Sequence, residues 1–128
     1  MPKVSSLQYG TFLDAVCLRT GAPYSDWRTQ FAGRPGMIVI CEPDEGSGEK
    51  MIYFYSNDQQ NGVQPFFRTS AGILVNDPPY TRITTNNSTY IFEIGDSVLT
   101  ARDKQELFRN VFLSPTAWLY GMDAAQPK

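Results

Sequence analysis

Apolar residues in the first 20 positions recur at intervals of three and four, which is the spacing of one face of an α-helix. They are Tyr9, Phe12, Leu13, Val16 and Cys17. Gly21 follows where a helix C-terminus is expected. A second, short helix is predicted from Asp26 to Phe31 or Ala32, with Ser25 as its N-cap. Residues 1–33 are therefore predicted to form a helical pair.

The middle of the chain has strand patterns instead. Residues 37–41 and 51–55 are continuously apolar, which is typical of strands buried on both faces, and a polar loop joins them as a hairpin. Residues 81–94 predict a second hairpin, with Tyr90, Phe92 and Ile94 facing the core. One or two short strands are predicted within residues 65–75. Short turns favour antiparallel pairing, so residues 37–99 are predicted to form a mostly antiparallel, curved sheet of four to six strands.

The last part of the chain predicts a helix and an apolar tail. Thr100 and Asp103 have the spacing of a capping box, and Pro115 follows the helical pattern. The apolar stripe between them consists of Leu107, Phe108, Val111 and Phe112. We expect a helix over residues 100–113 that packs on the sheet, followed by a docked tail at 114–128. The predicted fold is a single domain of the α+β class.

Composition removes several function classes. The chain has 128 residues, enough for one domain with a core, and 11 basic against 13 acidic side chains. The resulting net charge of −2 argues against nucleic-acid binding, which relies on many cationic contacts to phosphate. Histidine, the commonest general base and metal ligand, is absent. Because no phosphate-binding, dinucleotide or nucleophile motif occurs either, we predict no catalytic residues, no cofactor and no metal.

Three groups of side chains have more than one interpretation. Asp14, Glu93 and Asp96 are the acids nearest to apolar segments, but no sequence neighbour assigns them a catalytic role. The acidic loop at 42–49 lacks the spacing of a calcium-binding loop and is interpreted as solvated. Cys17 and Cys41 lie in apolar stretches and are interpreted as buried thiols, with a disulfide as the alternative.

The candidate binding residues are aromatic or arginine side chains. These residue types are enriched at binding hot spots and in small-molecule pockets. Tyr24, Trp27 and Arg28 lie around the start of the predicted second helix, and core packing is the alternative for Trp27. The other candidates are Tyr53 and Tyr55 on a predicted strand, and Trp118 and Tyr120 in the tail.

These patterns favour a small, soluble, nonenzymatic binding or interaction protein, with a protein partner or a second copy as its ligand. An outward-facing Ile91 and the apolar tail support a homodimer. The alternative is a small-molecule-binding protein or enzyme with an aromatic-lined pocket between sheet and helices. The sequence has no apolar run of 18 residues, and its first six residues do not resemble the apolar region of a signal peptide, so we expect a cytoplasmic protein without membrane contact.

Overall fold

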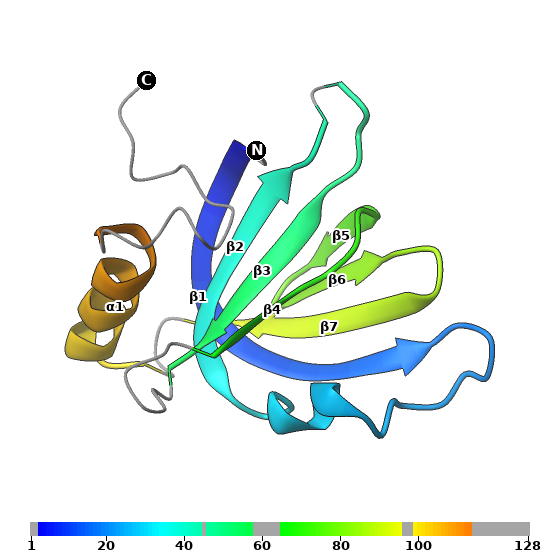
Figure 1. Cartoon of the computed structure of the whole chain (residues 1–128), viewed down its shortest axis with the longest axis horizontal. Helices are drawn as coiled ribbons and strands as arrows, with labels where there is room; N and C mark the ends of the chain where they lie inside the picture. The colour runs from blue at the N-terminus through cyan, green and yellow to red at the C-terminus, as the bar shows by residue number, and fades with distance from the viewer. Residues whose placement is uncertain (1–2, 45, 58–64, 96–98, 114–128) are drawn as a thin grey trace.

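The computed structural model describes residues 3–44, 46–57, 65–95 and 99–113. Seven strands form one antiparallel sheet in the order β4-β3-β2-β1-β7-β6-β5 (Figure 1). Their bounds are β1 Lys3–Cys17, β2 Pro35–Glu42, β3 Met51–Ser56, β4 Phe66–Arg68, β5 Ile73–Asp77, β6 Tyr80–Thr84 and β7 Ser88–Ile94. The predicted α+β class is therefore wrong: the described fold is mostly β, with one short C-terminal helix, α1 (Ala101–Phe108).

The predicted first helix is in fact β1, the central strand of the sheet. Its N-terminal half pairs with β2 and its C-terminal half pairs with β7, with a bulge between Phe12 and Asp14. Gly10 lies where the pairings overlap, and a Cβ atom there would lie 2.1 Å from the Glu93 carbonyl oxygen. Tyr9 packs on one face of the sheet and Phe12 on the other. Because both faces are covered and the bulge shifts the alternation, apolar residues on this strand imitate helical spacing.

The predicted second helix is a single 3-10 turn, η1 (Trp27–Gln30). Its N-cap is Asp26 rather than Ser25, since Asp26 Oδ1 accepts the Arg28 backbone N–H at 3.1 Å. So short a segment cannot offset the cost of nucleating an α-helix. It nevertheless places Phe31 in the core. Residues 1–33 therefore contribute a strand and a turn, not a helical pair.

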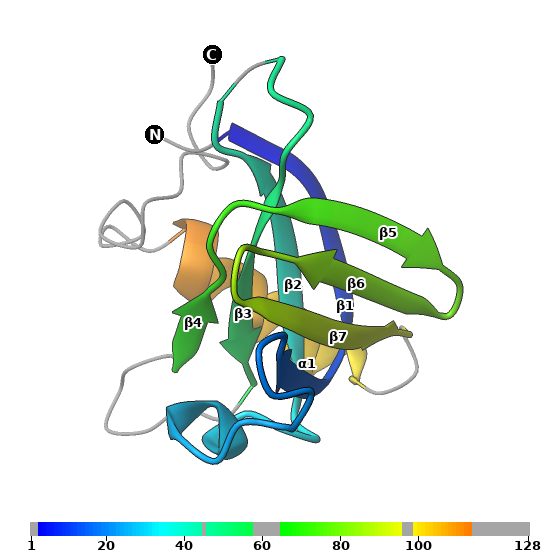
Figure 2. The same cartoon turned by 90° about the vertical axis from the view of Figure 1, so that its right-hand side faces the viewer.

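The sheet bends over its own inner face, so that β5, β6 and β7 lie across β2 and β3 (Figure 2). A bridge between Lys50 and Gly72 joins the start of β3 to the start of β5. Aromatic rings fill the space enclosed. Phe12 has its ring centroid 4.9 Å from that of Phe67 and 5.3 Å from that of Phe92. Such pairs add about 0.5–1.5 kcal/mol each beyond the burial of their area.

The outer face of the sheet is covered over β1, β2 and β3 by α1 (Figure 1). Thr100 and Asp103 form the predicted capping box, which starts this helix. Leu107 and, in the following π-helical turn η3 (Arg109–Leu113), Val111 are buried against the sheet. The predicted tail at 114–128 lies outside the described residues. No helix in the described part of the chain combines the length and the apolarity needed to cross a membrane.

The predicted antiparallel pairing is confirmed in its main features. The hairpins β2–β3 and β6–β7 both form, and Tyr90 and Phe92 are buried in the inner core. Residues 65–77 contain two strands, β4 and β5, rather than one. The sheet has seven strands rather than the predicted four to six, because the N-terminal segment adds β1 to it.

Candidate functional site

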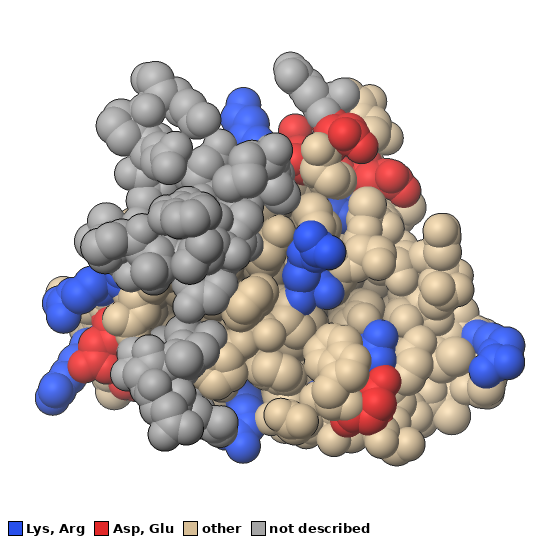
Figure 3. Space-filling view, in the orientation of Figure 1, with Lys and Arg blue, Asp and Glu red and all other residues tan. Residues whose placement is uncertain are grey.

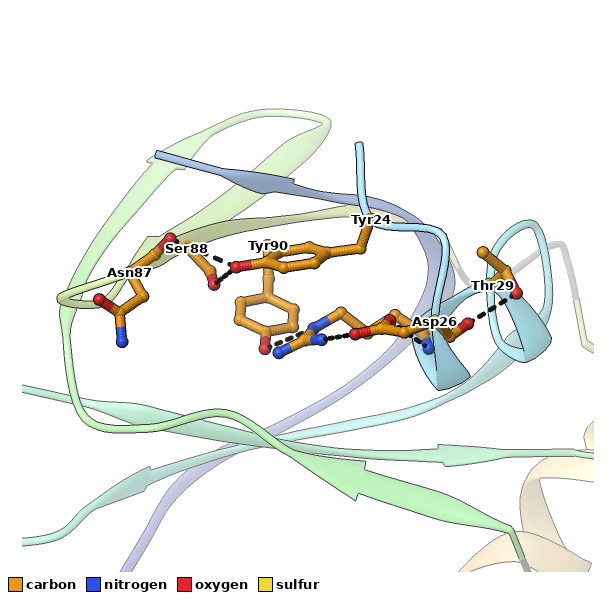
Figure 4. Close-up of polar contacts among 7 residues, drawn as sticks. Tyr24, Asp26, Thr29, Asn87, Ser88 and Tyr90 are labelled. Carbon is orange, nitrogen blue, oxygen red and sulfur yellow. Dashed lines mark hydrogen bonds and ion pairs between the residues drawn. The ribbon is translucent and has the colours of Figure 1, made fainter. Parts of the chain in front are cut away.

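Three of the predicted binding residues meet at one corner of the fold, beside η1. The Arg28 guanidinium lies 4.0 Å from the centre of the Tyr24 ring and 4.6 Å from that of Trp27. Its Nε donates to the Tyr90 hydroxyl at 3.0 Å, and it forms an ion pair with Asp26 (Figure 4). The sequence predicted this group around Tyr24, Trp27 and Arg28, while Tyr90 joins it only through the fold.

The non-covalent contacts of Arg28 connect the segment around η1 to strand β7. Burial alone would lower the pKa of this guanidinium, but the Tyr90 hydrogen bond and nearby charges offset that effect and raise the pKa. Only 17% of its side chain is exposed, and stacking on aromatic rings adds attraction. Tyr24 extends the link, because its hydroxyl lies 2.6 Å from Ser88 Oγ on β7 (Figure 4). These contacts attach the segment around η1 to the sheet and leave Trp27, 43% exposed, facing solvent.

The other predicted binding residues are placed differently. Tyr53 and Tyr55 are buried on the outer face of β3, in the cluster that α1 covers. Their rings stack on each other with centroids 6.4 Å apart. In the described structure they therefore pack as core. Trp118 and Tyr120 lie outside the described residues.

Cys17 borders a hollow that the sequence did not predict. The hollow has a volume of about 510 Å³ and is lined by Cys17, Leu18, Arg19, Tyr24, Asn86 and Asn87. Hydrogen bonds from the Thr20 backbone, then from its hydroxyl and the Arg19 backbone, lower the pKa of the Cys17 thiol to about 7. Cys41 is buried, and no disulfide links the two thiols. Cys17 is thus a half-buried thiol with a lowered pKa rather than a core residue.

Two of the acidic side chains singled out by the sequence, Glu42 and Asp14, contact nearby groups. Lys50 pairs with Glu42 at 2.6 Å and lowers the pKa of that carboxyl. Acidic groups gather beside the β2–β3 connection (Figure 3). Asp14 accepts the Ala15 backbone N–H at 2.8 Å, and Asp96 lies outside the described residues. Within the described ranges, no group of three or more acidic or cysteine side chains could hold a metal ion.

Two further hollows open on β1 and its neighbours. One, of about 440 Å³, lies between β1 and α1 and is lined by Tyr9, Lys104, Gln105, Phe108 and Arg109. The other, of about 430 Å³, lies near the β5–β6 turn and is lined by Gln8, Asn76, Pro78, Pro79, Tyr80, Thr81 and Ile94. The Gln8 Oε1 atom is buried there without a hydrogen-bond partner. Apart from the turn at Asp77-Pro78-Pro79, nothing in the sequence pattern indicates the second hollow.

Strand β5 is the most exposed part of the sheet. It pairs with β6 on one side and ends the strand order on the other. Ile73 is 56% exposed and Val75 46%, although both are β-branched apolar residues. The apolar run at 71–75 is visible in the sequence, but its position at an edge is not, because the pattern does not contain the strand order. Beyond the bridge at Gly72, no described strand pairs with this edge, and an apolar edge of this kind is a template for pairing with another strand.

Comparison with known proteins identifies no relative of this chain. Neither protein-family models nor curated proteins nor solved structures give a match to this chain.

Proposed function

We propose that this chain is a binding protein that associates with a second copy of itself through the edge of β5. The observation that carries this proposal is the exposure of Ile73 and Val75 on a strand that, among the described residues, has β6 as its one neighbouring strand. A free strand edge offers backbone donors and acceptors, and apolar side chains beside it gain from being covered.

The direction of the backbone supports pairing at this edge. Gly72 exchanges two backbone hydrogen bonds with Lys50, at 2.8 and 2.9 Å, on the side away from β6. Backbone direction alternates along a strand, so Leu74 and Asn76 are the next residues whose N–H and C=O groups face away from β6. Four of the five β5 residues are exposed, and the fifth, Leu74, is half-buried.

A two-fold axis at Val75 allows the outward-facing N–H and C=O groups of Leu74 and Asn76 to form hydrogen bonds with the second copy. In antiparallel pairing about that axis, Leu74 of one copy lies opposite Asn76 of the other, and each pair exchanges backbone hydrogen bonds. The two Val75 residues then form a non-hydrogen-bonded pair, in which side chains are closest. Such an interface is isologous, so it closes at two copies rather than growing into a fibre.

Further apolar side chains lie on the outer face near the edge, around the charged Arg82. Val75 pairs with Arg82 on β6, and Arg82 pairs with Ile91 on β7. Tyr80, next along β6 on the same face, is also exposed. The predicted contribution of Ile91 to self-association fits this position, although the predicted contribution of the tail lies outside the described residues.

Light scattering during size-exclusion chromatography tests the proposal. The wild-type chain is expected to elute with twice the monomer mass at high concentration and to dissociate on dilution. The variant Val75→Lys should be a monomer throughout, because the two-fold axis brings its two ammonium groups face to face and like charges directly opposite each other repel. Leu18→Lys, at a similarly exposed apolar position off this edge, is the matched control and should still dimerise. A monomeric wild-type chain, or a dimer that survives in the Val75→Lys variant, contradicts the proposal.

A further inference from the structure

The hollow between β1 and α1 combines aromatic walls with two cations. Tyr9 on β1 and Phe108 at the end of α1 supply the rings, and Lys104 and Arg109 supply the charges. Phe108 is 39% exposed, so part of its ring is accessible to a ligand. The volume of about 440 Å³ lies within the range of small-molecule sites.

The spacing along α1 brings the cations to this hollow together with the Phe108 ring. Lys104 and Phe108 are one helical turn apart, as are Gln105 and Arg109, so these four residues lie along one side of the helix. The Lys104 ammonium lies 5.7 Å from the centre of the Tyr9 ring, within the range of a cation–π contact. A ligand that contacts Tyr9 therefore lies close to a positive charge.

The acids of α1 do not neutralise these cations. Asp103 takes part in the cap at the start of the helix, and Glu106 pairs with Arg102 at 3.2 Å. Within the described ranges, the ion pairs of this protein involve neither Lys104 nor Arg109. Two cations without a carboxylate partner, at the opening of one hollow, attract an anion.

We infer that this hollow binds a small carboxylic acid with an apolar body. The carboxylate accepts hydrogen bonds from the Lys104 ammonium and the Arg109 guanidinium, and the apolar body contacts Tyr9 and Phe108. A doubly charged phosphate ester loses more hydration beside these rings than a carboxylate does, which favours the carboxylate.

This inference takes up the alternative prediction of an aromatic-lined pocket between sheet and helix. It goes beyond the proposed self-association, because that surface lies on β5 and this hollow is lined by β1, α1 and the first residue of η3.

An NMR titration with phenylacetate tests the inference. Phenylacetamide is the matched probe without the charge, and acetate is the probe without the apolar body. Phenylacetate should shift the backbone amide signals of Tyr9, Lys104, Gln105, Phe108 and Arg109 in a saturable way. Each of the other two probes should bind about tenfold more weakly, because it lacks either the charge-assisted hydrogen bonds or the buried ring. Added salt should weaken the binding of phenylacetate but not that of phenylacetamide.

Three results would overturn the inference. The first is the absence of a saturable shift at these residues, as expected if another part of the chain or a second copy fills the hollow. The second is equal binding of phenylacetate and phenylacetamide. The third is a set of shifts confined to another hollow.

Variants of α1 complete the test. The double variant Lys104→Gln with Arg109→Gln should lose the preference for phenylacetate over phenylacetamide. Arg102→Gln, which removes a cation of the same helix that does not line the hollow, should keep it. A preference that survives in the double variant contradicts the assigned roles of the two cations. If the double variant does not fold, the comparison of the probes on the wild-type chain remains decisive.

The Val75→Lys variant separates the two proposals. It should retain the binding of phenylacetate, because Val75 does not line this hollow. Loss of phenylacetate binding in that variant would contradict a site that is independent of the β5 edge.

Discussion

The two edges of the sheet differ in how they meet solvent. At one edge, β4 has only three residues, Pro65 precedes it, and Phe67 anchors it in the inner core. Phe66 stacks on Tyr55 with ring centroids 5.2 Å apart. At the other edge, β5 has five residues, and its β-branched side chains are exposed. Short length blunts an edge against pairing, as does the proline directly before β4, so among the described residues the longer, more exposed β5 is the more open edge.

The largest expected difference between the edges is in stability. Phe67→Ala removes a buried ring from the core beneath β4 and should lower the free energy of unfolding by about 3–5 kcal/mol. Val75→Ala on β5 should change it by no more than about 0.5 kcal/mol. Urea denaturation at low protein concentration, where association does not contribute, measures both. Similar losses for the two variants would mean that β5 is packed as tightly as β4.

A smaller loss of stability is expected from a substitution at Gly72, directly before β5. A Cβ atom at Gly72 would lie 2.2 Å from the Thr84 carbonyl oxygen, so Gly72→Ala must displace the backbone between β5 and β6. We expect a destabilisation of about 1–3 kcal/mol in the same urea measurement. Gly95→Ala is the control, because a Cβ atom at Gly95 would meet nothing within 4 Å. Equal stability of the two variants would show that the strand start adapts freely.

The smallest expected effect on stability comes from the ionisation of Cys17, which ends the central strand β1 and lies on neither edge of the sheet. Its pKa of about 7 is below the ordinary 9.0, so alkylation by iodoacetamide should rise with a midpoint near pH 7. The thiolate is favoured by folding. Its contribution to stability is therefore present above the unfolded pKa and is lost as pH falls through about 7.

Thr20→Val removes one of the hydrogen bonds and should move the alkylation midpoint upward, while buried Cys41 should stay unreactive. Alkylated protein should still dimerise, since Cys17 is not on β5. A wild-type midpoint at the ordinary value would refute the described environment of Cys17, and loss of dimers on alkylation would contradict the placement of the interface.

Sequence patterns predicted local structure better than long-range structure. The hairpins β2–β3 and β6–β7 and the cap at Thr100 depend on neighbouring residues, and all three were predicted. The identity of β1 depends on partners in β2 and β7, many positions away, and its bulge disguised the strand period. Among the binding candidates, the group around Arg28 was found from residue type, whereas the β5 edge became visible only through the strand order.

Disulfide trapping at Val75 tests the central claim most directly. In a Cys17→Ser background, Val75→Cys places two thiols at a non-hydrogen-bonded pair, where Cα atoms lie about 4.5 Å apart, within the reach of a disulfide. Ile73→Cys tests the register, since residue 73 lies opposite residue 77 of the second copy, and Arg68→Cys on β4 tests the other edge. Under mild oxidation, we expect rapid covalent dimers for Val75→Cys alone. Absence of those dimers, or equal rates for all three variants, would contradict pairing through β5.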